Sequence, residues 1–165
     1  MLEKNIREQI IELIHQQVVP AVGCTEPMAV ALCTARATEL LGQRPEYISV
    51  LLSANILKNA MGVGIPGTGM IGLPIAIALG ALVGKSEYQL EVIKDLTPVT
   101  LEAGKTFISE NRIDVKLKDA ITEKLYIEIT CEAEGHRATA IIMGTHTNIV
   151  FEEKDGTVLL DKMQP

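Results

Sequence analysis

The spacing of the hydrophobic positions changes about two thirds of the way along the chain. Up to about residue 110 they recur at helical intervals, whereas from residue 113 onward they alternate with polar residues. The first spacing is typical of helices with a buried stripe, and the second is typical of half-buried strands. The sequence therefore predicts an α+β fold in which buried apolar helices pack on a C-terminal antiparallel β-meander.

Two helices are expected before residue 45. Apolar residues from Leu2 to Ile14 line one face of an amphipathic helix that Pro20 ends. The segment 28–41 is rich in Ala and Leu, which predicts a mostly buried helix that its alanines allow to pack closely, and Gly42 stops it.

Three further helices are expected in the centre of the chain. The apolar run 70–83 predicts a buried helix that starts near Pro74, and the run is too short to cross a membrane. A short helix over 87–94 is expected, with Ser86 and Gln89 as a capping pair. The last helix begins at the cap Thr97 and ends near Glu110. Its expected buried face carries Val99, Ala103 and Phe107.

The strands are recognised by β-branched residues and by alternation. The segment 47–54 has the composition of a buried strand, although its spacing alone leaves a helix open. Turns are expected at 134–136 and at Asp155-Gly156. The strands of the predicted meander cover 113–117, 125–132, 138–143, 145–151 and 158–160.

Composition and charge narrow the class of protein. A chain of 165 residues with 47% hydrophobic and 22% charged residues predicts a single domain, residues 1–165, with a real core. The net charge of −6 argues against nucleic acid as a partner, because phosphate binding needs clustered Lys and Arg. Three cysteines without paired spacing and an N-terminus without a secretory signal favour reduced thiols, a cytoplasmic location and no membrane association.

The candidate chemistry begins at residues 20–27, which read PAVGCTEP. This turn places Cys24 at the start of a helix, where the helix dipole favours the thiolate that attacks electrophiles or binds metals. A small buried hydrophobe is the alternative for Cys24. Cys33 and Cys131 are interpreted as core residues, because Cys33 is too far along the helix to share a metal with Cys24 and Cys131 lies on the apolar face of a strand.

A second unusual stretch, residues 59–69, reads NAMGVGIPGTG, and its glycines expose backbone N–H groups to a ligand. Gly62, Gly64 and Gly67 formally match the dinucleotide motif GxGxxG. The acidic residue that follows, Glu87, is expected to begin a helix rather than to end a strand, so nucleotide binding is the weaker interpretation. His146 lies in the polar run Thr-His-Thr-Asn, where it can reach a ligand or serve as a hydrogen-bonded structural residue.

Together PAVGCTEP, NAMGVGIPGTG and the HTNIV segment at 146–150 resemble the L-cysteine desulfidase family, which is related to the alpha part of iron–sulfur L-serine dehydratases. The resemblance implies a lyase that needs no pyridoxal phosphate. Such an enzyme releases sulfide or water, ammonia and pyruvate from L-cysteine or L-serine by α,β-elimination, and its substrate binds an open iron of a [4Fe-4S] cluster. It implies that Cys24 is a cluster ligand and that the substrate lies near Thr25, Glu26, Asn59, Gly67, Thr68 and His146.

The resemblance also implies that the chain is the N-terminal portion of a longer protein. A three-cysteine cluster needs two further ligands, and neither Cys33 nor Cys131 occupies a motif position. The missing ligands are therefore expected in a C-terminal portion, and this chain alone is expected to be inactive and to bind no complete cluster. The alternative is a non-catalytic small-molecule-binding or dimerisation module. Self-association stays open, although an apolar central helix and exposed strand edges favour it.

Overall fold

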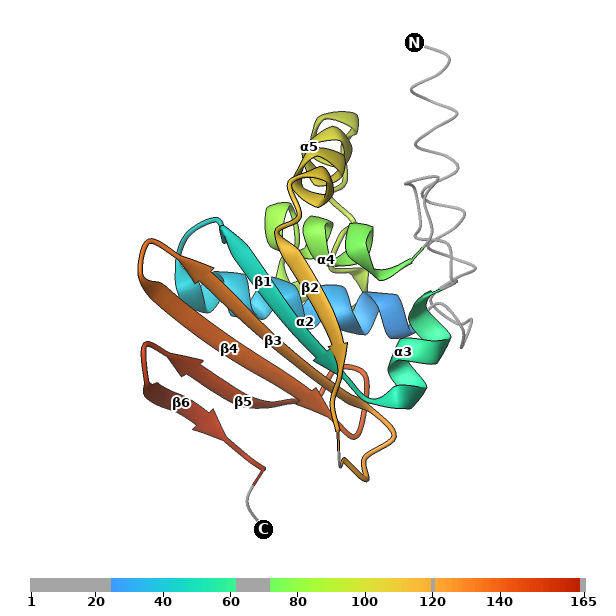
Figure 1. Cartoon of the computed structure of the whole chain (residues 1–165), viewed down its shortest axis with the longest axis vertical. Coiled ribbons are helices and arrows are strands. Elements are labelled where there is room, and N and C mark those ends of the chain that lie inside the picture. The colour runs from blue at the N-terminus through green and yellow to red at the C-terminus, as the bar shows by residue number, and fades with distance from the viewer. Residues whose placement is uncertain (1–24, 62–71, 120, 164–165) are drawn as a thin grey trace.

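The computed structural model describes residues 25–61, 72–119 and 121–163, which form one six-stranded sheet and its covering helices (Figure 1). The expected N-terminal helix lies outside these residues. The helices are α2 (Thr25–Leu41), α3 (Ala54–Met61), α4 (Leu73–Leu82), the 3₁₀ helix η2 (Ser86–Glu91) and α5 (Pro98–Ser109). The strands are β1 (Tyr47–Leu52), β2 (Ile113–Leu117), β3 (Tyr126–Ala133), β4 (His136–Met143), β5 (Ile149–Lys154) and β6 (Thr157–Asp161).

The strand order is β2-β1-β3-β4-β5-β6, and β3 to β6 form the antiparallel meander that the alternation predicts. The predicted α+β class is thus confirmed. Strand β1 joins the meander antiparallel to β3. Strand β2, which was predicted as part of the meander, instead pairs with β1 in parallel at the far edge. The parallel pair arises because α3, α4, η2 and α5 connect β1 to β2, and such a crossover returns the chain in the same direction.

Helix α2 lies between the sheet and α4. It packs on β3, β4 and β5 on one side and on α4 on the other, while α5 packs on α4 (Figure 1). Gly80 of α4 makes the close approach possible, because a Cβ atom there would lie 2.5 Å from the backbone oxygen of Ala31. A Cβ on Gly84 would lie 2.9 Å from the Cβ of Ala35. The predicted close packing through alanines is therefore confirmed, and glycines supply the facing surface.

Charged groups connect α2 to strand β5. Arg36 donates from Nε and Nη2 to the two carboxylate oxygens of the buried Glu152 on β5, at 2.5 and 3.1 Å. Lys154 Nζ donates to the backbone oxygen of Leu41, 3.1 Å away, and so satisfies a carbonyl that the helix leaves unpaired. Both contacts involve β5, so the orientation of α2 depends on this strand.

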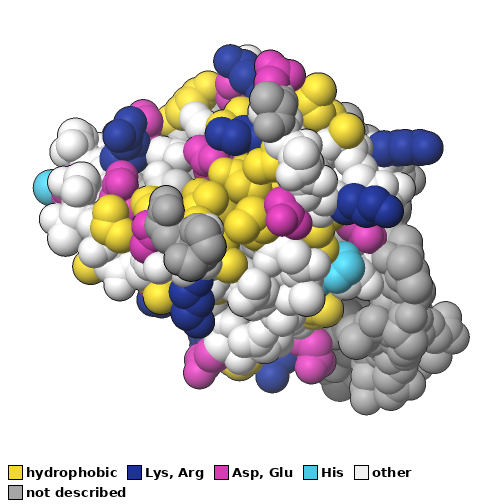
Figure 2. Space-filling model, turned by 90° about the horizontal axis from the view of Figure 1, so that it is seen from below, with side chains coloured by type: hydrophobic (Ala, Val, Ile, Leu, Met, Phe, Trp, Pro, Cys, Tyr) yellow, Lys and Arg dark blue, Asp and Glu magenta, His cyan; other side chains and the backbone are white. Residues whose placement is uncertain are grey.

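The opposite face of the sheet carries a smaller apolar cluster. Tyr126, Ile141 and Val150 are buried in it, with Ile121, Met143 and Phe151 packed alongside. Figure 2 shows apolar side chains gathered near the middle of the surface seen from below, with acidic and basic groups around them. In the described ranges, no helix combines the length and apolar character that a membrane-spanning segment requires.

The predicted helices over 28–41, 70–83 and 97–110 and the strand over 47–54 are all present, with ends shifted by a few residues. Thr97 caps α5 as expected, and Thr100 completes the capping box. The buried face of α5 was predicted correctly at Phe107 but wrongly at Val99. Val99 is 78% exposed, and the buried residues are Leu101, Gly104 and Phe107, since the side chains of Leu79 and Ile75 pack directly over Gly104.

Three other local predictions are wrong. Helix α3 extends through a segment predicted as the end of a strand and the start of a loop. The capping pair of the 87–94 helix does not form, because Ser86 donates to Glu39 from N and Oγ and Gln89 has a φ of 57° that breaks the helix. The strand predicted over 145–151 begins only at Ile149, so the polar run before it is a turn.

The packing of α2 and α5 on α4 predicts different outcomes for two glycine substitutions. Gly80→Ala should lower the free energy of unfolding by about 1–3 kcal/mol, because its Cβ meets backbone that cannot move aside. Gly104→Ala is the matched control. Its Cβ meets only the ends of the Leu79 and Ile75 side chains at 3.1 and 3.2 Å, and the gain in helix propensity of about 1 kcal/mol offsets the crowding. Urea unfolding of both variants tests the difference, and equal losses would contradict it.

Candidate functional site

Helix α2 begins at the motif that carries the candidate chemistry. Its first residues are Thr25, Glu26 and Pro27, and a proline suits this position because the first turn has no intrahelical partner for its N–H. Thr25 is partly buried, whereas Glu26 is only 6% exposed. The helix dipole favours a negative charge at this end. The fold therefore places a carboxylate in the interior at the one end of α2 that stabilises it.

His146 lies on the turn between β4 and β5, which local hydrogen bonds keep in place. Asn148 Nδ2 donates to the backbone oxygen of Met143 at 2.9 Å, and Met143 N donates to the backbone oxygen of Asn148 at 3.2 Å. Gly144 has a φ of 88°, which suits glycine. The His146 side chain is 32% exposed, so the turn presents an imidazole that is partly open to solvent.

The structure brings Glu26 and His146 together although 120 residues separate them in the chain. His146 Nε2 lies 3.3 Å from Glu26 Oε1, and in the tautomer with its proton on Nε2 it donates to that oxygen. The other carboxylate oxygen, Oε2, is buried and has no hydrogen-bond partner in the described part of the chain. Since buried polar atoms are normally paired, this oxygen is the feature that most needs a functional explanation.

Of the remaining predicted site residues, only Asn59 lies within the described part of the chain. Asn59 lies near the end of α3, which packs beside the first turns of α2 (Figure 1), and its side chain is partly buried. Cys24, Gly67 and Thr68 lie outside the described residues. Of the predicted set, then, the structure shows direct contact between Glu26 and His146 and puts the helix of Asn59 nearby.

The other two cysteines lie in the core, as predicted. Cys33 Sγ is fully buried and donates to the backbone oxygen of Ala140 at 3.2 Å, and Cys131 is also fully buried. Burial raises the pKa of the Cys33 thiol well above its usual value and raises the pKa of Cys131 to about 12. Neither residue supplies the thiolate that a metal or an electrophile requires. Among the described residues, no three His, Cys, Asp or Glu side chains are grouped so that they could bind a metal ion.

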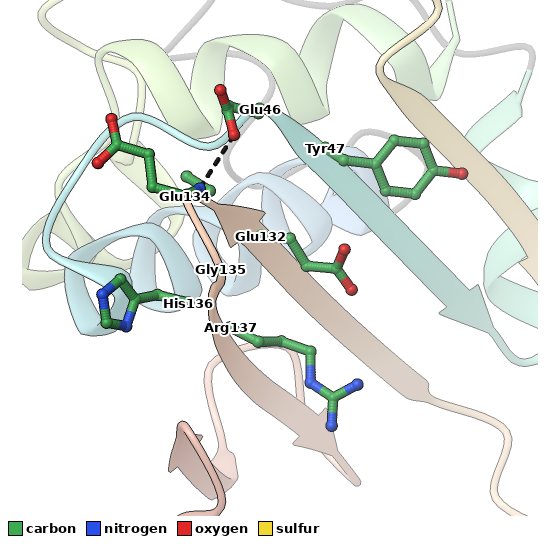
Figure 3. A pocket seen from close by; sticks show the side chains of 8 residues that line it. Glu46, Tyr47, Glu132, Glu134, Gly135, His136 and Arg137 are labelled. Atoms are coloured by element: carbon green, nitrogen blue, oxygen red, sulfur yellow. Dashed lines mark hydrogen bonds between the residues drawn. The ribbon is translucent and has the colours of Figure 1, made fainter.

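Sequence reasoning missed an open groove at the other end of the sheet, with a volume of about 440 Å³ (Figure 3). Tyr47, Glu132 and Arg137 are cross-strand neighbours on β1, β3 and β4 and project on the same side. Glu46 closes one end by accepting from the backbone N of Glu134 at 3.0 Å. The strand register is the signal that could have revealed this row. The groove mixes both charge signs, and it holds no buried unpartnered group like Glu26.

The incomplete pairing of Glu26 predicts a small effect of Glu26→Gln on stability. The variant loses the attraction between the carboxylate and the helix end, which is about 0.3–1 kcal/mol. It also no longer buries a carboxylate oxygen that has no partner among the described residues, and this relief offsets the loss. We expect the free energy of unfolding to change by less than about 1 kcal/mol. Glu152→Gln is the matched control, and it should cost about 1–3 kcal/mol because Arg36 loses its charged partner. Urea unfolding at pH 7 compares the two, and an equally large loss for Glu26→Gln would mean that both of its oxygens are paired in solution.

Burial of the core thiols predicts that they do not react in the folded protein. In the Cys24→Ser variant, a water-soluble aromatic disulfide at pH 8 should release no thiol signal from native protein. The reason is that both remaining thiols are buried and protonated at that pH. The same sample in concentrated guanidinium is the control and should show two reactive thiols. Rapid reaction without denaturant would place at least one of them at the surface.

The sequence comparisons identify close homologues. The chain is 69% identical over 163 residues to a UPF0597 protein of Bacteroides fragilis, 65% identical over 164 residues to one of Bacteroides thetaiotaomicron, and 48% identical over 150 residues to one of Aeromonas hydrophila. These alignments cover 99%, 99% and 91% of this chain but only 38%, 38% and 34% of the relatives. No protein-family model matches the chain. Its close homologues are thus proteins named UPF0597, and the chain spans less than two fifths of their length.

Proposed function

We propose that the chain is the N-terminal portion of an iron–sulfur-dependent lyase of the L-cysteine desulfidase type, which acts without pyridoxal phosphate. The substrate is L-cysteine or L-serine. Elimination removes the Cα proton and breaks the Cβ–S or Cβ–O bond, and the enamine that remains becomes pyruvate and ammonia by taking up one water. Sulfide is the other product from cysteine, and water leaves in its place from serine.

One observation carries this proposal. Glu26 and His146 come from two separate motifs of the resemblance, and their side chains lie 3.3 Å apart across 120 residues of sequence. In the sequence, Glu26 follows Cys24, the expected cluster ligand, by two positions. A buried carboxylate in contact with an imidazole is a suitable pair for binding and reacting with a small polar molecule.

The described residues do not by themselves fit an iron–sulfur cluster. Cys33 and Cys131 are buried as thiols in the core, and no group of three potential ligands occurs in the described ranges. Cys24 is therefore the ligand that this chain offers, and the proposal assigns the others to the rest of a longer protein. The length of the homologues is compatible with such a split site, because the chain covers only 38% of the Bacteroides proteins.

The proposed partners follow from the same picture. They are a small amino-acid substrate and the remaining portion of the longer protein, with a cytoplasmic location and no role for nucleic acid or membranes. Self-association through the edge strands β2 and β6 stays open, since Val158 and Leu159 of β6 are 51% and 56% exposed.

A non-catalytic small-molecule-binding or dimerisation module is the second candidate. The observation that favours it is the unpartnered oxygen of Glu26, which can bind a ligand without any reaction. The two candidates differ in whether the ligand is consumed, so pyruvate formation separates them.

Anaerobic iron–sulfide reconstitution tests the lyase proposal. We expect visible cluster absorbance and cysteine-dependent pyruvate and sulfide formation in a version extended to the length of the homologues, and neither in the 165-residue chain. Cys24→Ala in the extended protein should abolish both signals because one ligand is lost. Cys131→Ala is the matched control and should retain both, since Cys131 lies in the core. An extended protein that gains neither cluster nor activity would overturn the lyase proposal.

A further inference from the structure

Only one of the two carboxylate oxygens of Glu26 has a hydrogen-bond partner among the described residues. Oε1 has His146 Nε2 at 3.3 Å, while Oε2 has no hydrogen-bond partner among the described residues even though the side chain is only 7% exposed. The other carboxylate buried in the described core, Glu152, has both oxygens bonded to Arg36. The contrast shows that this fold can pair a buried carboxylate fully, whereas one acceptor of Glu26 has no partner among the described residues.

The charge and geometry of this acceptor select the kind of ligand. A carboxylate repels anions, so a phosphate or a second carboxylate is a poor match. A divalent cation needs several oxygen or imidazole ligands, and no group of three is present in the described ranges. A primary ammonium group has one positive charge and three N–H donors, so a single carboxylate oxygen forms a short, charge-assisted hydrogen bond with it.

We propose that Glu26 Oε2 binds the α-ammonium group of the amino-acid ligand and that His146 is the positioning residue that orients the carboxylate through Oε1. The inference rests on the proposed function for the identity of the ligand as an amino acid. The inference adds that Glu26 is the residue that selects a ligand with a free primary amine. Analogues whose α-amino group is blocked or missing would then bind poorly, because they leave the buried carboxylate oxygen without a partner and not because their shape is wrong.

The burial of the first turns of α2 strengthens such a bond. Met28, Ala29 and Val30, which follow Glu26 on α2, are at most 5% exposed. A charge-assisted hydrogen bond is stronger in such an environment than in water, because the local dielectric is lower. The same burial makes loss of the ammonium group costly, since the carboxylate oxygen is left without water or donor.

Binding of methylammonium to the 165-residue chain tests the inference without the rest of the enzyme. NMR signals of the His146 ring report on Glu26 directly, because the two side chains are in contact. We expect a saturable shift with methylammonium chloride, with a Kd on the order of 10 mM for one such contact. Tetramethylammonium chloride at the same ionic strength has no N–H donor and should give no saturable shift. Equal responses to the two salts, or no saturable response to methylammonium, would overturn the inference.

A charge-neutral variant identifies the acceptor. Glu26→Gln should weaken methylammonium binding at least about tenfold, because the bond loses its negative partner. Glu132→Gln removes an exposed carboxylate on β3 and should leave the affinity unchanged. Unchanged binding in Glu26→Gln would place the ammonium group elsewhere and refute the assignment.

The outcome is separable from that of the proposed function. If methylammonium binds through Glu26 but the extended protein forms no pyruvate, the ammonium site stands and the lyase proposal fails. If the extended protein is active, Glu26→Gln should raise KM for L-cysteine about tenfold or more. An unchanged KM there would reject the ammonium site and leave the lyase proposal intact.

Discussion

The structure depends on burying one helix from two sides. Twelve of the seventeen residues of α2 are buried, because the sheet covers one side of the helix and α4 covers the other. A helix in that position cannot carry a wide polar face, and its neighbours can approach only where side chains are small. Ala31 and Ala35 on α2, Gly80 on α4 and Gly84 just after the end of α4 meet this requirement. The near absence of large aromatic residues in the sequence is consistent with such a core.

Because α2 is buried on two sides, its polar groups need hydrogen-bond partners within the protein. Thr34 and Thr38 donate to carbonyl oxygens of their own helix, four residues earlier, and Cys33 donates to a carbonyl oxygen of the sheet. Arg36 extends to the buried Glu152. Glu26 is the exception, because one of its oxygens has no described partner. In a helix whose other polar groups are paired, that exception is more informative than a buried carboxylate would be by itself.

Local sequence signals predicted most of the elements, because they depend on spacing that is read within a few residues. They failed where a distant group decided the conformation. Ser86 bonds to Glu39 instead of capping its own helix, and Val99 is exposed because the chain presents Gly104 to the side chains of α4 instead. The position of β2 beside β1 likewise follows from the crossover and not from the alternation of β2 itself. Tertiary contacts of this kind cannot be read from a single segment.

The candidate site likewise combines residues that short motifs indicate with a contact that only the tertiary structure creates. Glu26 and His146 belong to two short motifs of the resemblance, but their contact depends on how the meander positions the turn of His146. Between β4 and β5 the pairing shifts, with Ile141 opposite Phe151 and Ile142 opposite Ile149, so Val150 is an extra residue in β5. Such a bulge bends the strand and turns the side chains that follow. The turn with His146 connects β4 to this irregular strand, so the position of His146 relative to α2 depends on how β4 and β5 pair. The turn between β4 and β5 thus supplies His146, and Glu26 at the start of α2 supplies the other residue of the site.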